Sequence, residues 1–290
     1  MRATAFVSLS LLSAFTLASD AASGHGVGRF ALDESSLQQW KLPRRLKEIS
    51  GLALTPDDRL FAVDDEQAVI YEIDYRQGKT IKTFALGSPI THADFEGIAY
   101  LDEMFYLVTS SGLVYVAPEG ENDERVDFEV YQTGLGRFCE IEGLTAAIDS
   151  GTLLLACKKS RGKTKPPKFS IFFWSPASGR VLHDREIVIP KKEISNKIGE
   201  KQIRPSGIVI DPLTGHLFGI AGPQRAIFEL APNGELIDAI ILPLADRHRQ
   251  PEGIEITQDG KLVITDEGGK KKARLSVYSP GHNKNSDQQE

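Results

Sequence analysis

A short pattern built on glycine recurs five times along the chain. The glycines lie 46, 46, 64 and 46 residues apart, so three intervals are equal and one is longer by 18 residues. Recurrence at one fixed interval indicates a fold made by repeating one supersecondary unit. The five motifs are Glu48-Ile-Ser-Gly51-Leu, Asp94-Phe-Glu-Gly97-Ile, Glu140-Ile-Glu-Gly143-Leu, Arg204-Pro-Ser-Gly207-Ile and Gln250-Pro-Glu-Gly253-Ile.

Each motif opens a series of short apolar segments separated by polar turns, with no helical period of any length. Four strands in about 40–50 residues are typical of one propeller blade. The sequence therefore predicts an all-β fold, a five-bladed β-propeller of four-stranded blades. We expect the later strands at Leu60–Asp64, Val69–Ile73 and Thr80–Phe84 in blade one, Phe105–Thr109, Leu113–Val116 and Val126–Tyr131 in blade two, Leu153–Cys157, Ser170–Trp174 and Arg180–Ile189 in blade three, Leu217–Ala221, Ala226–Leu230 and Glu235–Leu242 in blade four, and Leu262–Asp266 and Leu275–Tyr278 in blade five.

The last repeat lacks a fourth strand, because the chain after Tyr278 is a polar tail. The N-terminal segment Leu37–Leu42, followed by Pro43, resembles Ala239–Leu242 followed by Pro243. We therefore expect an N-terminal strand to close the ring as the outer strand of blade five. The predicted organisation is a propeller over residues 36–280, preceded by a flexible segment over 22–35 and followed by a disordered tail over 281–290.

The N-terminus has the form of a secretory signal peptide, which we assign to residues 1–21. Arg2 precedes an apolar stretch from Ala5 to Ala18, and cleavage fits best after Ala18 or Ala21. We expect a periplasmic or secreted location of the mature chain; the alternative is a membrane anchor formed by an uncleaved leader. No later apolar run reaches the ~18 residues of a membrane span, so we expect no transmembrane span in the mature chain.

Composition excludes several classes of protein. The chain has 34 Lys and Arg against 40 Asp and Glu, a formal net charge of −6, whereas a dedicated nucleic-acid binder is usually strongly basic. We therefore expect no nucleic-acid partner. Two cysteines are too few for a disulfide-dense scaffold or a multi-cysteine zinc site.

The residue before each repeated glycine should begin an innermost strand at one end of the central channel, which we call the mouth. Three of the five are carboxylates from three blades, and unpaired they would repel one another and lose hydration. Ca²⁺ resolves this, because it prefers a roomy cage of oxygen ligands. The alternative is that the glutamates cap backbone N–H groups. The five residues are Ser50, Glu96, Glu142, Ser206 and Glu252.

Further acids follow the second strands of blades one and five, which are neighbours in a closed ring. Asp64 and Asp266 end these strands, and Asp65, Glu66 and Glu267 follow them. They complete the calcium cage or form a second cation site. The predicted metal ligands are therefore Glu96, Glu142 and Glu252, with Asp64 and Asp266 as further candidates.

Charge is divided unevenly over the predicted ring. By the repeat alignment, the mouth-face loops carry 22 basic and 14 acidic residues, which leaves +8 on this face and −14 elsewhere. An acidic centre with a basic rim suits an anionic small molecule or an envelope glycan or phosphate bridged by a cation. The alternative is a rim of solvated lysines without a ligand.

Both cysteines belong to the predicted blade three and lie at the mouth end of its first hairpin. Cys157 ends the second strand, and Cys139 lies three residues before Glu142. A disulfide is feasible if the loop before Glu140 folds back, and export to an oxidising compartment favours it. The alternative is two free thiols packed as small apolar side chains.

Several motifs resemble known families. Pro205-Ser-Gly-Ile-Val-Ile-Asp211 and Pro251-Glu-Gly-Ile-Glu-Ile look like NHL-type propeller repeats. Together with Val63-Asp-Asp-Glu66 and Asp94-Phe-Glu-Gly-Ile-Ala99, they resemble the SdiA-regulated (YjiK-like) family, and the Asp-Phe-Glu-Gly-Ile element also resembles the esterase-like phytase family. The resemblance implies an exported bacterial five-bladed propeller that binds calcium, and no established reaction.

Two functions from different classes follow. The first is a non-enzymatic, calcium-stabilised binding module of the cell envelope, which we expect to be a monomer. The second is a metal-dependent hydrolase of phosphoesters or lactones, in which His92, His248 or a glutamate would handle protons. The sequence offers no convincing pair of base and nucleophile, so it leaves open whether the protein is an enzyme.

Overall fold

The computed structural model describes residues 26–148, 151–160 and 168–281. The predicted signal peptide over 1–21 and residues 282–290 of the predicted tail lie outside the described residues. Among the residues that are described, no helix combines the length and the apolar character needed to cross a bilayer.

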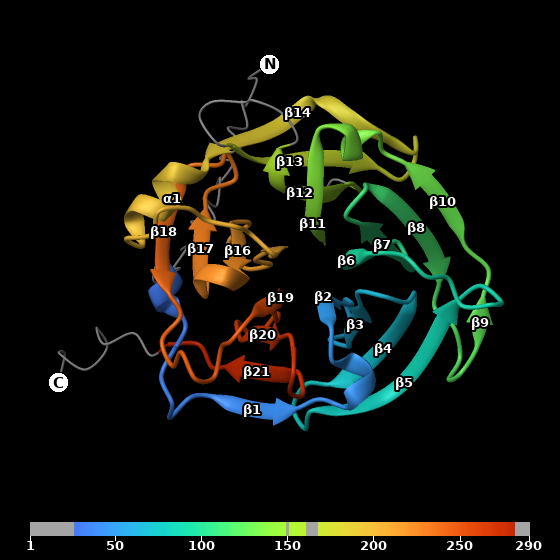
Figure 1. Ribbon diagram of the computed structural model, residues 1–290, viewed down its shortest axis with the longest axis horizontal. Helices are drawn as coiled ribbons and strands as arrows, with labels where there is room; N and C mark the ends of the chain where they lie inside the picture. Colours follow the sequence, from blue (N-terminus) through green and yellow to red (C-terminus); the bar gives the residue numbers. More distant parts are fainter. Residues whose placement is uncertain (1–25, 149–150, 161–167, 282–290) are drawn as a thin grey trace, which may run out of the picture.

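Five blades of four antiparallel strands lie around a common centre, which confirms the five-bladed β-propeller (Figure 1). Strands β2, β6, β11 and β19 lie at the centre and β5, β10, β14, β18 and β1 at the rim. The blades are, from centre to rim, β2 (Ile49–Leu54), β3 (Leu60–Asp64), β4 (Val69–Asp74) and β5 (Lys79–Leu86); β6 (Phe95–Leu101), β7 (Met104–Thr109), β8 (Leu113–Pro118) and β10 (Glu129–Gln132); β11 (Cys139–Ala146), β12 (Leu153–Ser160), β13 (Lys168–Ser175) and β14 (Arg180–Pro190); β15 (Gly207–Ile210), β16 (Leu217–Ala221), β17 (Ala226–Leu230) and β18 (Leu236–Ile241); and β19 (Pro251–Ile256), β20 (Leu262–Asp266), β21 (Arg274–Tyr278) and β1 (Gln38–Lys41).

The fifth blade combines the two ends of the chain. Its outer strand β1 pairs antiparallel with β21, with Trp40 opposite Leu275. The other three strands of this blade come from the C-terminal part of the chain.

The repeated glycines lie where innermost strands of adjacent blades touch. A Cβ atom at Gly97 would lie 2.8 Å from the Leu144 backbone nitrogen, and one at Gly51 would lie 2.9 Å from the Gly97 Cα atom. No side chain fits at such distances without a shift of backbone. The 46-residue pattern therefore marks the contacts that let five blades meet at one axis.

The axis itself is nearly filled by apolar side chains. The residue after each repeated glycine is buried there, and the remaining cavity measures about 10 Å³, about the space of one water molecule. The axial plug, as we call it, separates the mouth from the opposite end of the axis, which we call the floor. It consists of Leu52, Ile98, Leu144, Ile208 and Ile254.

Neighbouring blades pack face to face through aromatic rings. Phe61 of blade one contacts Phe105 of blade two at a centroid distance of 4.6 Å, and Tyr106 of blade two contacts Trp174 of blade three at 6.1 Å. Such pairs bury large apolar surfaces with defined ring geometry. The hydrophobic core therefore runs between the blades.

One expected strand needs correction. The outer strand of blade two is β10, not Val126–Tyr131, and the short strand β9 (Arg125–Val126) pairs parallel with β5 of blade one. Val126 joins blade one because it packs in the same apolar cluster as Phe84.

The segment predicted to be flexible over 22–35 is packed against the ring from residue 26 onward. Val27 and Phe30 are buried around the short 3₁₀ helix η1 (Val27–Arg29), and Phe30 contacts the Phe218 ring at 5.6 Å. Arg29 forms a 2.9 Å ion pair with Asp211, whose side chain is buried. The two buried apolar side chains and the ion pair explain why this segment packs against the ring. The composition of the segment alone did not predict this packing.

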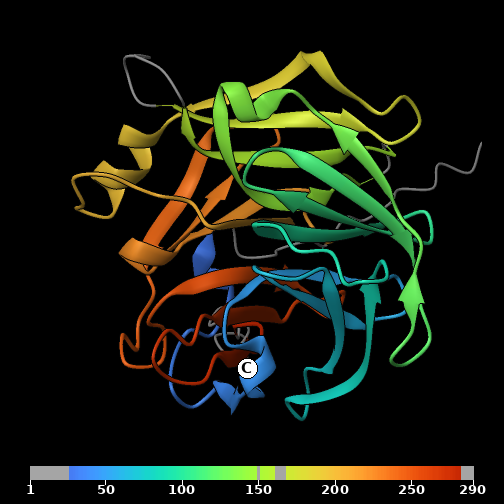
Figure 2. The ribbon, with the colours of Figure 1, turned by 45° about the vertical axis from the view of Figure 1, so that its right-hand side comes forward.

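The 18-residue excess between the third and fourth motifs contains the single α-helix of the described chain, α1 (Lys191–Lys197). The other helical segments of the described chain are 3₁₀ helices, among them η2 (Arg44–Leu46), η3 (Leu135–Arg137) and η4 (Gly222–Gln224). Figure 2 shows α1 and the loop after it projecting from the edge of the ring. Ile194 and Ser195 of this helix are buried, which fixes it against the ring near β18.

Candidate functional site

The three predicted glutamates of the mouth each lie at a break in strand register. Phe95 pairs with Thr109 and Gly97 with Val108, so Glu96 is an extra residue in β6. Glu252 occupies the same place between Pro251 and Gly253 of β19, and the register also shifts around Glu142 in β11. A bulge of this kind redirects a side chain out of the regular alternation. Here it turns three carboxylates toward the mouth.

Burial raises the pKa values of all three, and neighbouring carboxyls add to the shift. Burial, with Glu142 and Asp94 nearby, raises the pKa of Glu96 to about 9. Burial raises the pKa of Glu252 to about 8, and Glu142 adds to it. The pKa of Glu142 rises to about 7, because burial outweighs the opposing attraction of Lys158. The mouth therefore holds more negative charge than its surroundings stabilise.

Lys158 supplies the one cation that directly contacts this group in the described chain. Its Nζ atom lies 2.7 Å from Glu142 Oε2, and only 5% of the Glu142 side chain is exposed. Burial alone would lower the pKa of Lys158, but Glu142, Glu252 and Glu96 together raise it. One ammonium group thus interacts with three carboxyls, of which only one is within ion-pair distance.

The side chains at the mouth offer the type of donor atom that calcium binds, but those that the structure describes are not gathered into a closed coordination site. Carboxylate and hydroxyl oxygens are the ligands that Ca²⁺ takes. The buried Ser50 Oγ atom has no hydrogen-bond partner and lines the same end of the axis as Glu96 and Glu252. However, within residues 26–148, 151–160 and 168–281, no three His, Cys, Asp or Glu side chains are gathered closely enough to hold an ion.

A second acidic group forms at the mouth ends of blades one and five. Burial, together with neighbouring acids, raises the pKa of Asp64 to about 6 and that of Asp65 to about 7. Glu267 belongs to this group and also raises the pKa of Glu252. Lys47, 3.0 Å from Glu48, is the paired cation of this group.

Asp266 is not among these groups. One of its oxygens lies 2.8 Å from His248 Nδ1, and the other accepts hydrogen bonds from the backbone N–H groups of Arg249 and Gln250. His248 Nε2 in turn lies 2.7 Å from the Tyr278 hydroxyl, and all three side chains are buried. Asp266 therefore fixes the loop before β19 rather than facing the mouth. The same burial keeps His248 away from any substrate.

Ser206 stands where blades two, three and five carry a glutamate. Its hydroxyl donates to the Pro251 carbonyl at 2.8 Å and accepts from the Gly222 N–H at 3.0 Å. It links blade four to blade five. Gly222 also leaves room for Glu252, since a Cβ there would lie 2.9 Å from Glu252 Oε1.

A basic pocket opens beside the glutamates, between blade three and the α1 insertion. It has a volume of about 570 Å³ and five cationic against two anionic side chains. Burial, with Lys158 and Arg204 nearby, lowers the pKa of Lys191 to about 8. The charged lining residues are Lys158, Lys191, Lys192, Lys201, Arg204, Glu140 and Glu200.

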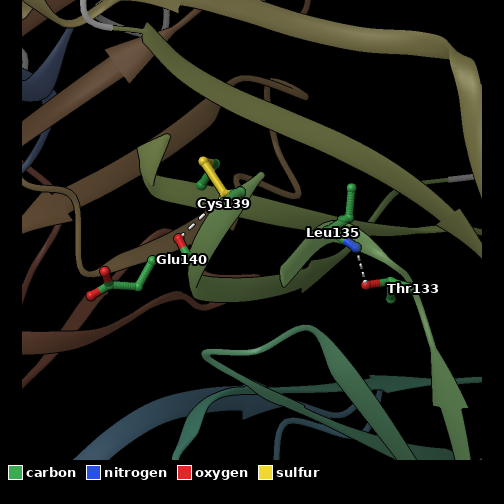
Figure 3. Close-up of a disulfide and its surroundings, with 5 residues drawn as sticks. Thr133, Leu135, Cys139 and Glu140 are labelled. Atoms are coloured by element: carbon green, nitrogen blue, oxygen red, sulfur yellow. Dashed lines mark hydrogen bonds between the residues drawn. A yellow bond between two sulfur atoms is a disulfide. The ribbon is translucent and has the colours of Figure 1, made fainter. Parts of the chain in front are cut away.

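The two cysteines form a disulfide with a Cα–Cα distance of 5.7 Å, so the bonded alternative is the one observed. Figure 3 shows the Glu140 side chain pointing away from it. Cys139 directly precedes Glu140, and Cys157 directly precedes Lys158. The bond therefore fixes the ends of β11 and β12 next to two residues that line the basic pocket.

Two residues of this site were not singled out from the sequence. Lys158 and Lys191 were counted only as rim charges. Nothing in the spacing marks Lys158 as the partner of Glu142.

Comparison with protein families finds a match to the C-terminal part of the chain. A family model described as SdiA-regulated matches residues 178–288. This segment resembles the SdiA-regulated family. It covers blades four and five with the end of blade three, and so confirms over this range the resemblance inferred from the motifs. No curated protein matches the sequence significantly.

Solved structures confirm the propeller fold at low sequence identity. A glutaminyl cyclase of Myxococcus xanthus is 11% identical with a TM-score of 0.56, over 84% of this chain and 96% of that one. A luciferin-regenerating enzyme is 12% identical with a TM-score of 0.50, over 84% and 95%. At such identities the likeness concerns the fold alone.

Proposed function

We propose that this propeller is an exported binding protein of the cell envelope that holds a small anionic molecule at its mouth. The observation that carries the proposal is the basic pocket of about 570 Å³, with five cationic side chains, directly beside three partly or fully buried glutamates. Arginine and lysine side chains in a concave site bind phosphate, carboxylate or sulfate groups.

Calcium is the second element of the proposal. Glu96, Glu142 and Glu252 would supply its oxygen ligands, with the unpartnered Ser50 hydroxyl as a fourth donor. The raised pKa values of the three carboxyls support this, because a bound dication would stabilise the ionised forms that burial and neighbouring acids disfavour. When bound, the ion would also draw an anionic ligand toward the glutamates.

The location outside the cytoplasm rests on the leader-like N-terminus and is supported by the disulfide. Disulfides persist in oxidising compartments and are rare in the cytosol. The Cys139–Cys157 bond is consistent with such a compartment.

Calorimetry with simple probes tests the proposal. Inositol hexakisphosphate and inorganic phosphate are titrated into the full chain with CaCl₂, with uncharged myo-inositol as the control ligand. The double variant Lys192→Met with Arg204→Met should lose at least tenfold in affinity. Lys79→Met, which removes an exposed lysine bonded only to Gln77, should bind like the wild type. Equal affinity in the double variant, or no anion binding at all, would overturn the proposal.

A metal-dependent hydrolase of phosphoesters or lactones is the second candidate, and Lys191 is the observation that favours it. With its pKa lowered to about 8, a substantial fraction of this amine is neutral at mildly alkaline pH and able to accept a proton. Chelator-sensitive turnover of p-nitrophenyl phosphate or a simple lactone, lost in Glu142→Gln and Lys191→Met, would establish it. Absence of turnover with calcium present would exclude these two substrate classes.

A further inference from the structure

A second cavity lies at the floor of the propeller, beyond the axial plug. We call it the floor cavity; its volume is about 460 Å³. The last residues of the innermost strands line it, together with the turns that follow them. Because the plug leaves only about 10 Å³ on the axis, a molecule in the floor cavity has no contact with the mouth.

One carboxyl interrupts an otherwise small and uncharged ring in this cavity. The residue two positions after each repeated glycine lines it, and in four blades that residue is Ala53, Ala99, Thr145 or Val209. In blade five it is Glu255. The four small side chains leave the space of the cavity, and the fifth places the one carboxyl of this ring in it.

No cation of the protein stabilises this carboxyl. Lys, Arg and His are absent from the lining, and no ion pair to Glu255 is formed within the described residues. Its Oε2 atom accepts a 3.2 Å hydrogen bond from the Ile256 N–H. Burial raises its pKa to about 8, although the N–H groups of Ile256 and Leu54 oppose the shift. The other carboxyl of the lining, Asp58, already pairs with Arg76.

We propose that the floor cavity binds a small organic cation, a primary alkylamine, whose ammonium group pairs with Glu255. The alkyl part would pack against Ala53, Ala99 and Val209, and the ring of Tyr100 offers a face for the cationic end. One carboxylate with small apolar neighbours suits an ammonium ion better than a metal, which needs several oxygen ligands. An anion would find no cationic side chain in this lining. The proposal does not depend on the function of the mouth.

The probe for the test is n-butylammonium, titrated calorimetrically into the full chain at pH 9. At this pH most of Glu255 is ionised while the amine keeps its proton. The other titratable groups of the lining, Asp58 and Tyr100, are present in every variant except the control below. We expect saturable binding of butylammonium and none of the uncharged n-butanol.

Glu255→Gln keeps the size of the side chain and an acceptor for the Ile256 N–H, and should weaken binding at least tenfold. The control Asp58→Asn neutralises the cavity carboxyl that is already paired, and should stay within about twofold of the wild type, in line with the small worth of exposed ion pairs. Ala99→Leu retains Glu255 but fills the space, and should also abolish binding if the cavity is the site. Equal affinity of the wild type and Glu255→Gln, or no saturable heat with the wild type, would overturn the proposal.

Discussion

Replacing Lys158 by Met removes the single ammonium group that contacts the mouth glutamates. Breaking a buried pair costs about 3–5 kcal/mol when the remaining partner stays charged. Here Glu142, with its pKa at about 7, can take up a proton instead. A pH of 8 lies about one unit above the pKa of Glu142, so protonating this carboxyl costs about 1.4 kcal/mol. The loss from the Lys158–Glu142 pair is therefore limited to about that amount. Weaker attraction to Glu96 and Glu252 is lost as well, so we expect about 2 kcal/mol, which corresponds to a Tm lower by about 4–8 °C.

The assay is thermal unfolding of the chelator-treated protein at pH 8 and pH 5. Lys192→Met is the matched control, because it removes an exposed lysine of the same pocket. At pH 5 Glu142 is already protonated in the wild type, so the difference should shrink or reverse. Saturating CaCl₂ at pH 8 should restore Lys158→Met by supplying the missing cation. A Tm equal to that of the wild type at pH 8, or an equal loss at both pH values, would refute the reasoning.

Other predictions concern acidity, packing and the disulfide. The folded pKa of Glu252, about 8, exceeds its ordinary value, so the native state holds the extra proton and stability must fall as pH rises from ~4.5 to ~8. Half of that pKa shift corresponds to about 2 kcal/mol of stability. Glu252→Gln should therefore flatten the dependence of Tm on pH in the absence of calcium. An unchanged slope of Tm against pH in this variant argues against the prediction. Gly97→Ala should lower Tm strongly, because the new Cβ would meet backbone at 2.8 Å, whereas Gly28→Ala, with open space around it, should be neutral; equal effects would contradict the packing argument. Reducing Cys139–Cys157 should cost about 3 kcal/mol in denaturant unfolding, and thiol titration of the unreduced, unfolded chain should find no free thiol.

Much of the fold could be predicted because it repeats. The equal glycine spacing reflects the contacts between innermost strands, where Gly51 approaches Gly97 and Gly97 approaches Leu144. The spacing could not place the outer strands as well. Val126 joins the neighbouring blade because of its apolar packing, which depends on a side chain, Phe84, some forty residues away.

The candidate site was predicted in part. The repeat places Glu96, Glu142 and Glu252 at equivalent register breaks of the innermost strands β6, β11 and β19. Asp266 was grouped with them because it ends a strand at the mouth, but its side chain turns into the blade toward His248. Side-chain direction depends on the neighbouring loops, which do not repeat.

The basic pocket could be anticipated only as an excess of charge. Its wall is the α1 insertion, a helix without a counterpart in the other blades as far as the chain is described. A non-repeating segment gives no register from which to place Lys191. Its proximity to Lys158 is a tertiary contact that no spacing in the sequence encodes.

Calorimetric titration of CaCl₂ into the chelator-treated full chain at pH 8 tests the central claim most directly. The wild type should show one saturable calcium site at the mouth, and at 100 times Kd the ion should stabilise the fold by about 2.7 kcal/mol. The double variant Glu96→Gln with Glu252→Gln should lose both the heat and most of the Tm shift. No calcium binding by the wild type, or a full response in the double variant, would contradict the claim that these glutamates form a cation site.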